Sequence, residues 1–83
     1  MTTLDEVLQV LDEVLQLGGR SASMTVRTPL LGAVPEFDSM AVVSVLTALE
    51  ERYGFVVDDD EVEATTFETV GSVVEFVERK NEE

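Results

Sequence analysis

Ser39 has the most suggestive chemistry in this sequence, because it follows an acid, Asp38, at the predicted start of a helix. Its hydroxyl cannot be a self-activated nucleophile, since the 83-residue chain has no His and no Cys and nothing in it could act as a base at neutral pH. A helix N-terminus favours an anion, because its first N–H groups are unpaired and the helix dipole is positive there. Ser39 is therefore either a plain helix cap or a residue to which another protein attaches an anionic group.

The composition gives no support to other kinds of chemistry. Without Cys or His there is no disulfide, thiolate nucleophile, Ser-His-Asp triad or HExxH metal site. The single lysine, Lys80, lies near the C-terminus, so no phosphate-binding loop of the GxxxxGK type exists. A calcium loop starting at Asp58 would need Gly and Glu at its sixth and twelfth positions, which hold Glu63 and Thr69. We predict no catalytic residue and no metal site, and so not an enzyme.

The charge of the chain indicates what kind of partner it can have. Five Lys and Arg against 18 Asp and Glu give a net charge of −13, which repels nucleic acid and favours partners with basic docking faces. No apolar run approaches the roughly 18 residues of a membrane span, and the N-terminus lacks the pattern of a signal peptide. We expect a monomeric cytoplasmic protein without membrane insertion.

The elements that must position Ser39 form one all-α domain over residues 1–83. Apolar residues at helical spacing predict a helix over about 3–17, with a capping box of Thr3 and Glu6 and an end at Gly18-Gly19. Its repeated hexapeptide LDEVLQ is too short to indicate a coiled coil. A long loop over 18–38 leads to a second helix over about 39–53. A strand is the competing prediction for the β-branched run at 41–45.

Two further helices complete the predicted fold. Acids at 58–61 suit the start of a short helix over about 59–64. Thr69 caps a last helix over about 69–80, where Arg79 and Lys80 suit its C-terminal end. Three longer helices and one short helix predict a small four-helix bundle.

The stretch Leu31–Met40 resembles the modification site of the acyl carrier proteins, whose typical core is Asp-Ser-Leu. The similarity covers nearly the whole chain and includes Tyr53-Gly54 at the end of the second helix and Thr69-Val70 at the start of the last. The resemblance implies that a phosphopantetheinyl transferase moves 4′-phosphopantetheine from coenzyme A onto Ser39. The thiol of that arm then carries an acyl or aminoacyl group as a thioester. By the same resemblance, Asp38 assists recognition by the transferase, and Met40, in place of the usual Leu, packs near the arm.

A second serine competes for this role. Leu17–Ser21 (LGGRS) resembles the attachment site of peptidyl carrier domains, which reads Leu-Gly-Gly-His-Ser. No helix with an apolar face follows Ser21, however, and Pro29 interrupts the segment. We therefore predict attachment at Ser39.

The predicted partner surface departs from the pattern of the fatty-acid carriers, which usually place acids in the early turns of the second helix. Here Ala41 and Ser44 stand at those positions, so we expect a neutral centre with an acidic rim and partners outside ordinary fatty-acid synthesis. The residues predicted to contact partners are Glu36, Ala41, Ser44, Val45, Glu50, Glu51, Asp58, Asp59, Asp60 and Glu61.

Three functions remain open. The leading hypothesis is a free-standing acyl carrier, and the stretch Pro35–Met40 also looks like carriers from exosortase or exopolysaccharide gene clusters, which work beside an acyl or aminoacyl ligase. The second is an aminoacyl or peptidyl-type carrier loaded by an adenylating ligase. The third is an acidic interaction module in which Ser39 only caps a helix.

Overall fold

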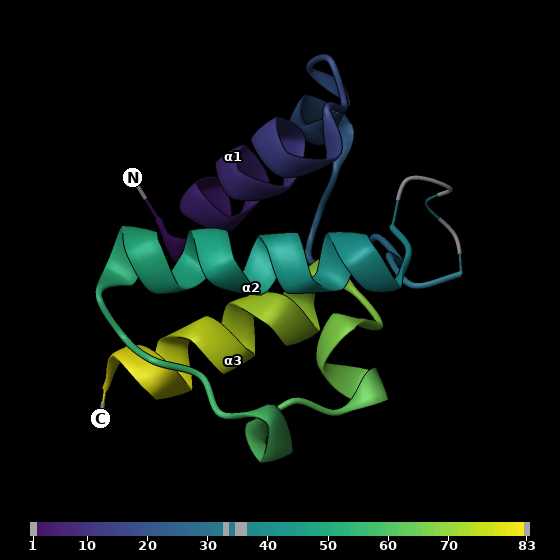
Figure 1. The fold of residues 1–83 in the computed structure, drawn as a ribbon. Coiled ribbons are helices and arrows are strands. Elements are labelled where there is room, and N and C mark those ends of the chain that lie inside the picture. The colour runs from purple at the N-terminus through teal and green to yellow at the C-terminus, as the bar shows by residue number, and fades with distance from the viewer. Residues whose placement is uncertain (1, 33, 35–36, 83) are drawn as a thin grey trace.

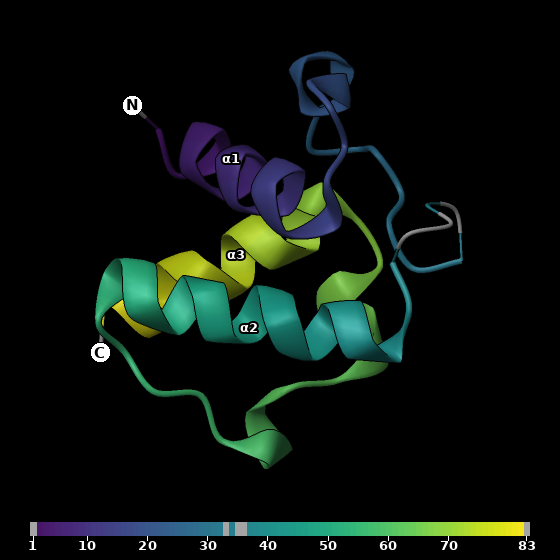
Figure 2. The same ribbon diagram turned by 45° about the horizontal axis from the view of Figure 1, so that its top comes forward.

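The computed structural model describes residues 2–32, 34 and 37–82. Their α-helices are α1 (Thr3–Leu15), α2 (Ser39–Tyr53) and α3 (Val70–Asn81). Three short 3-10 turns lie between them: η1 (Arg20–Ser23), η2 (Asp59–Glu61) and η3 (Ala64–Phe67). Figures 1 and 2 show α1 packed against α2 and α3, with η2 and η3 on the connection between α2 and α3. The described residues contain no strand, and so the all-α prediction is confirmed.

Helix α1 buries one face, made by Val7, Val10, Leu11 and Leu15. The helix is capped one residue earlier than predicted. Thr2 accepts the N–H of Asp5 (3.1 Å) and donates its own N–H to the Asp5 carboxylate (3.5 Å). The prediction of a Thr3–Glu6 box and an end at residue 17 was wrong. Gln16 already adopts the left-handed conformation, with φ 54°, and so ends the helix.

Glu6 is engaged elsewhere, because its carboxylate accepts a hydrogen bond from the Tyr53 hydroxyl at 2.7 Å. This bond ties the start of α1 to the end of α2. Burial, and then the hydrogen bond to Glu6, raise the pKa of Tyr53 to about 12, so the phenol stays protonated and remains a donor.

Helix α2 has the predicted bounds, because both of its ends carry strong local signals. Asp38 is the N-cap, and its side chain accepts the Ala41 N–H at 2.9 Å. Gly54 ends the helix with φ 74°, a conformation that favours glycine. The strand alternative for residues 41–45 is wrong, since Val45 and Leu49, four residues apart, form the buried stripe of a helix.

Thr69 is the N-cap of helix α3, and so the prediction that Thr69 caps the last helix is confirmed. Thr69 accepts the Ser72 N–H (3.1 Å), and the Ser72 hydroxyl accepts the Thr69 N–H (3.0 Å). The helix runs to Asn81 and contributes five buried apolar residues to the interior: Val70, Val73, Val74, Phe76 and Val77.

The short helix predicted over 59–64 is absent, and η2 and η3 stand in its place. Like charges one helical turn apart destabilise an α-helix, and this segment carries four acids. Glu63 is extended (φ −119°, ψ 165°) and separates the two turns. The part of the chain that the structure describes is therefore three α-helices with 3-10 turns, and the four-helix count is not confirmed.

Residues 26–30 of the loop over 18–38 pair with the start of α3 and the residues before it. The Val26 and Thr28 carbonyls accept the N–H groups of Gly71 (2.8 Å) and Val70 (2.9 Å), and so satisfy donors that a helix start leaves unpaired. Further along, the Leu30 N–H donates to the Glu68 carbonyl (2.9 Å). The loop also contains η1, which the sequence did not predict.

Candidate functional site

Ser39 is exposed and is the first residue of α2. The preceding Asp38 supplies the cap, and no hydrogen bond joins the Ser39 hydroxyl to another residue in the described parts of the chain. The interpretation of Ser39 as a plain cap is therefore wrong. Its hydroxyl is an accessible group that the helix does not use.

Phe37 positions the chain just before Ser39. Its ring is 4% exposed and packs against Phe67, with ring centroids 5.5 Å apart and planes at 57°. The Phe37 N–H donates to the Val34 carbonyl at 2.9 Å. Two residues after this anchor, Ser39 and Met40 lie at the surface, and Met40 is 74% exposed. The role of Met40 beside an arm stays a prediction.

Ser21, the competing serine, already donates hydrogen bonds to the Asp12 carboxylate. Its hydroxyl donates to the Asp12 carboxylate at 2.6 Å, and its N–H donates to the same carboxylate at 3.3 Å. The Gly19 N–H is a third donor, at 3.1 Å. The hydrogen bond from Ser21, foremost, holds the pKa of Asp12 below its ordinary value. Ser21 therefore closes the turn after α1, and it sits on η1 rather than at the start of an α-helix.

The residues expected to contact partners on α2 divide by exposure. Ser44 and Glu51 are exposed, and Ala41 and Glu50 are half-buried. Val45 was wrongly predicted as a contact residue, because it is fully buried. The helical period turns Val45 to the interior, where it is part of the hydrophobic core.

The remaining predicted contact residues lie around η2. Asp58 and Asp60 are exposed, and Glu61 pairs with Lys80 at 2.6 Å. The hydrogen bond from Lys80, foremost, lowers the pKa of Glu61. Glu36 and the side chain of Asp59 lie outside what the structure describes. The Lys80 side chain is 8% exposed, so the ion pair fixes η2 firmly against α3.

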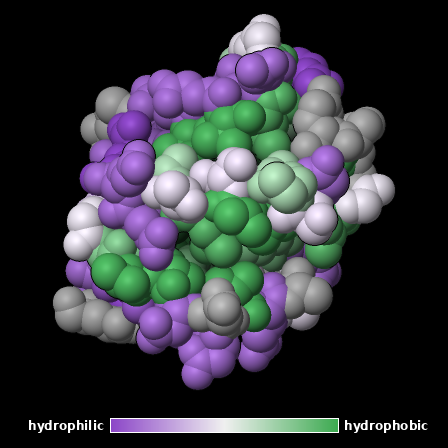
Figure 3. Space-filling view, in the orientation of Figure 1, coloured by the Kyte–Doolittle hydropathy of each residue, from purple (hydrophilic) through white to green (hydrophobic). Residues whose placement is uncertain are grey.

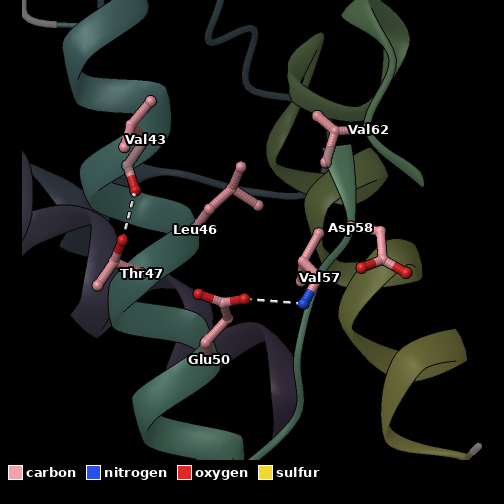
Figure 4. A pocket seen from close by; sticks show the side chains of 7 residues that line it. All are labelled: Val43, Leu46, Thr47, Glu50, Val57, Asp58 and Val62. Carbon is pink, nitrogen blue, oxygen red and sulfur yellow. Dashed lines mark hydrogen bonds between the residues drawn. The ribbon is translucent and has the colours of Figure 1, made fainter. Parts of the chain in front are cut away.

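An open pocket of about 340 Å³ lies between α2 and the connection that follows it (Figure 4). Its lining is mostly apolar and consists of Val43, Leu46, Thr47, Glu50, Val57, Asp58 and Val62. The Glu50 carboxylate accepts the Val57 N–H at 2.7 Å and so joins the two walls. This pocket could not be predicted from the sequence, because its two walls come from separate segments and no local pattern pairs them.

Metal and membrane sites find no support in the described residues. They contain no group of three or more acidic side chains placed to hold a metal ion. None of their helices is both long and apolar enough to cross a bilayer.

Among the described residues, the exposed Ser39 stands at the first position of α2, directly after the Asp38 that caps the helix. The chain matches the family described as "phosphopantetheine attachment site" over residues 5–77 and belongs to it. The cofactor of this family is covalently bound 4′-phosphopantetheine.

Comparison with solved structures shows which kind of phosphopantetheine-bearing protein this chain resembles. The chain is similar to the solution NMR structure of a holo acyl carrier protein from Nitrosomonas europaea, with 53% identity, full coverage of both chains and a TM-score of 0.91. A comparison with curated protein sequences gives no match. This protein is therefore a member of the acyl carrier protein family, with the all-helical acyl carrier fold.

Proposed function

We propose that this protein is a free-standing acyl carrier that holds its cargo as a thioester on 4′-phosphopantetheine attached to the Ser39 Oγ. The observation that carries the proposal is the exposed Ser39 hydroxyl at the first position of α2, left unused because Asp38 caps the helix. The new P–O bond to Ser39 replaces the anhydride bond of coenzyme A, releasing 3′,5′-ADP. The arm supplies the thiol that this Cys-free chain lacks.

The attachment requires a separate transferase. The chain contains no His, and no described side chain hydrogen-bonds the Ser39 hydroxyl to take its proton. The transferase must therefore supply the base, and we propose that Asp38, the exposed residue directly before Ser39 in the chain, serves as a recognition group. A phosphodiester on Ser39 would lie at the positive end of α2, which favours an anion.

The pocket beside α2 supports an acyl cargo. Its lining starts at Val43, one helical turn after Ser39, and continues with Leu46 and Val62. Apolar side chains that begin one turn after the attachment point provide a surface for an aliphatic chain.

An aminoacyl or peptidyl-type cargo is the second candidate, and one observation favours it. Glu50 and Asp58 place two carboxylates in the pocket lining, where they would attract an ammonium group. The resemblance of Pro35–Met40 to carriers that work beside a ligase, in exosortase or exopolysaccharide clusters, makes an adenylating acyl or aminoacyl ligase the first partner to test. We further propose that the carrier acts as a monomer in the cytoplasm, with acyl-processing enzymes as later partners.

Intact-mass measurement tests the attachment. The protein is incubated with coenzyme A, Mg²⁺ and a broad-specificity transferase, beside the variants Ser39→Ala and Ser21→Ala. We expect the wild type and Ser21→Ala to gain one phosphopantetheine and Ser39→Ala to gain none. Modification of Ser39→Ala but not of Ser21→Ala would overturn the site. A wild type that gains no mass would leave the acidic interaction module as the better function. The mass of protein isolated from its own cells separates acyl from aminoacyl cargo.

A further inference from the structure

Residues 57–62, which we call the strap, form the wall of the pocket opposite α2. Val57 and Val62 of the strap lie across the pocket from Val43 and Leu46 (Figure 4). Figure 3 shows apolar side chains below the middle of the view, between α2 and a hydrophilic lower edge, where Figure 1 places this connection. The pocket therefore keeps its shape only while the strap keeps its place beside α2.

The strap is not held by the hydrophobic core. None of the described side chains of residues 55–65 is buried. Before the strap, Phe55 is half-buried and stacks on Tyr53, with ring centroids 5.7 Å apart and planes at 4°. After it, the first buried residues are Thr66 and Phe67. A segment with few buried apolar contacts opens at a lower free energy than the core, so the strap can move while the α-helices stay folded.

Polar contacts tie the strap to the helices on either side. The Glu50 carboxylate of α2 accepts the Val57 N–H at 2.7 Å. On the other side Glu61 pairs with Lys80 of α3 at 2.6 Å, and we call this ion pair the latch. The Lys80 side chain is 8% exposed and that of Glu61 is 29% exposed, so the cation is the more buried partner. A buried charge that loses its partner is costly, and the latch therefore holds the strap against α3.

We propose that Lys80 is a positioning residue for the cargo site, because the latch keeps the strap in place as the apolar wall of the pocket. With the latch closed, an aliphatic chain on the Ser39 arm can lie between the strap and α2, shielded from water. With the latch broken, the strap moves away and the chain loses one wall. A two-carbon acyl group has almost no apolar surface to bury there, so the latch should not affect it. This inference rests on the proposed function and names a control of its cargo site.

Hydrogen exchange on the unloaded protein tests the latch itself. Lys80→Met removes the ammonium group and keeps an unbranched apolar side chain, and the half-exposed Glu61 is left to bind water. We expect the amides of residues 58–63 to exchange at least about fivefold faster than in wild type, with the α-helices unchanged. Glu61→Gln should have the same effect. The control Glu78→Gln removes an exposed carboxylate from α3 and should leave exchange in the strap as in wild type. Unchanged exchange of the strap in both latch variants would overturn the inference.

Cleavage of the cargo thioester tests what the latch does for the pocket. Wild type, Lys80→Met, Glu61→Gln and Glu78→Gln are loaded by a broad-specificity transferase from acetyl- or octanoyl-coenzyme A and purified. Hydroxylamine then attacks the thioester carbonyl, forming the hydroxamate and releasing the thiol of the arm, and intact mass follows the loss of cargo. We expect the octanoyl group to be cleaved about five- to tenfold faster in both latch variants than in wild type, and the acetyl group less than about twofold faster.

The dependence on chain length separates this role from a general loosening of the fold. Equal acceleration of acetyl and octanoyl cleavage would overturn the inference, and so would an octanoyl rate that neither latch variant changes. Glu78→Gln should match wild type with both groups, and an octanoyl effect as large as that of Glu61→Gln would attribute the result to net charge instead. A wild type that takes up no acyl arm at Ser39 would refute the proposed function, whereas a loaded wild type with an ineffective latch would refute this inference alone.

Discussion

Replacing Phe37 with Ala is the sharpest test of how the fold holds Ser39 in place. Phe37 lies in the chain between the loop and α2, and its ring is 4% exposed against Phe67. The substitution removes the whole ring from the interior and leaves a cavity. No other side chain of residues 37–40 is buried, so this ring is the buried anchor directly before α2.

The expected loss is large relative to the total stability. A Phe→Ala change in a core lowers the free energy of unfolding by about 3–5 kcal/mol, and the lost pairing of the two rings is about 0.5–1.5 kcal/mol of it. A chain of this length has a total of roughly 4–12 kcal/mol. Phe37→Ala should therefore remove roughly a quarter or more of the stability.

Urea denaturation followed by far-ultraviolet circular dichroism measures this loss. Leu31→Ala serves as the control, because Leu31 belongs to the same loop but is 46% exposed, and we expect it to lower the free energy of unfolding by less than about 1 kcal/mol. If Phe37→Ala also costs less than about 1 kcal/mol, the ring does not anchor α2, and the argument for a fixed Ser39 fails.

Four other predictions concern the helix start, the loop, acid stability and salt. Asp38→Ala should lower the free energy of unfolding by about 1 kcal/mol, whereas Ser39→Ala should change it by less than about 0.5 kcal/mol, and thermal melts showing the reverse order would contradict the capping assignment. Gly71→Ala should cost about 1–3 kcal/mol in urea denaturation, because its Cβ would lie 2.7 Å from the Val26 carbonyl oxygen, and a neutral effect would refute that close packing. The pKa of Asp12 is lowered in the folded protein, so the contribution of its ionised carboxylate to the free energy of unfolding is complete above about pH 5 and is lost as the pH falls through the folded-state pKa. The difference in free energy of unfolding between wild type and Asp12→Asn should therefore shrink below about pH 4. The rate of loading by the transferase should fall as the salt concentration rises, because the electric field of the −13 chain is screened within about 10 Å at 0.1 M. A loading rate that does not depend on salt would refute electrostatic steering.

Local signals allowed much of this fold to be predicted from sequence. Both ends of α2 are set by residues adjacent in the chain, the Asp38 cap and the Gly54 stop, so its bounds were predicted correctly. The cap of α1 was misplaced because Thr2 and Thr3 present equivalent side chains. The hydrogen bond between Glu6 and Tyr53, 47 residues away, shows that the Glu6 carboxylate does not take part in the cap, and the local sequence cannot reveal this bond.

The remaining features depend on contacts between distant segments. The acidic run before Val62 suits a helix start as well as a 3-10 turn, and its pairing with Lys80 cannot be seen from local sequence. The loop carbonyls that accept the first N–H groups of α3 belong to the backbone, so no side-chain pattern in the sequence predicts these hydrogen bonds. Val45 was misassigned to the surface because a β-branched run gives both faces of the helix the same apolar character.

Peptide mapping after loading tests the central claim most directly. Cleavage after Arg20, Arg27 and Arg52 separates Ser21, in a peptide of residues 21–27, from Ser39, in a peptide of residues 28–52. Fragmentation of the second peptide distinguishes Ser39 from Ser44. We expect phosphopantetheine on the 28–52 peptide, localised to Ser39. The arm on the 21–27 peptide, or on Ser44, would contradict it.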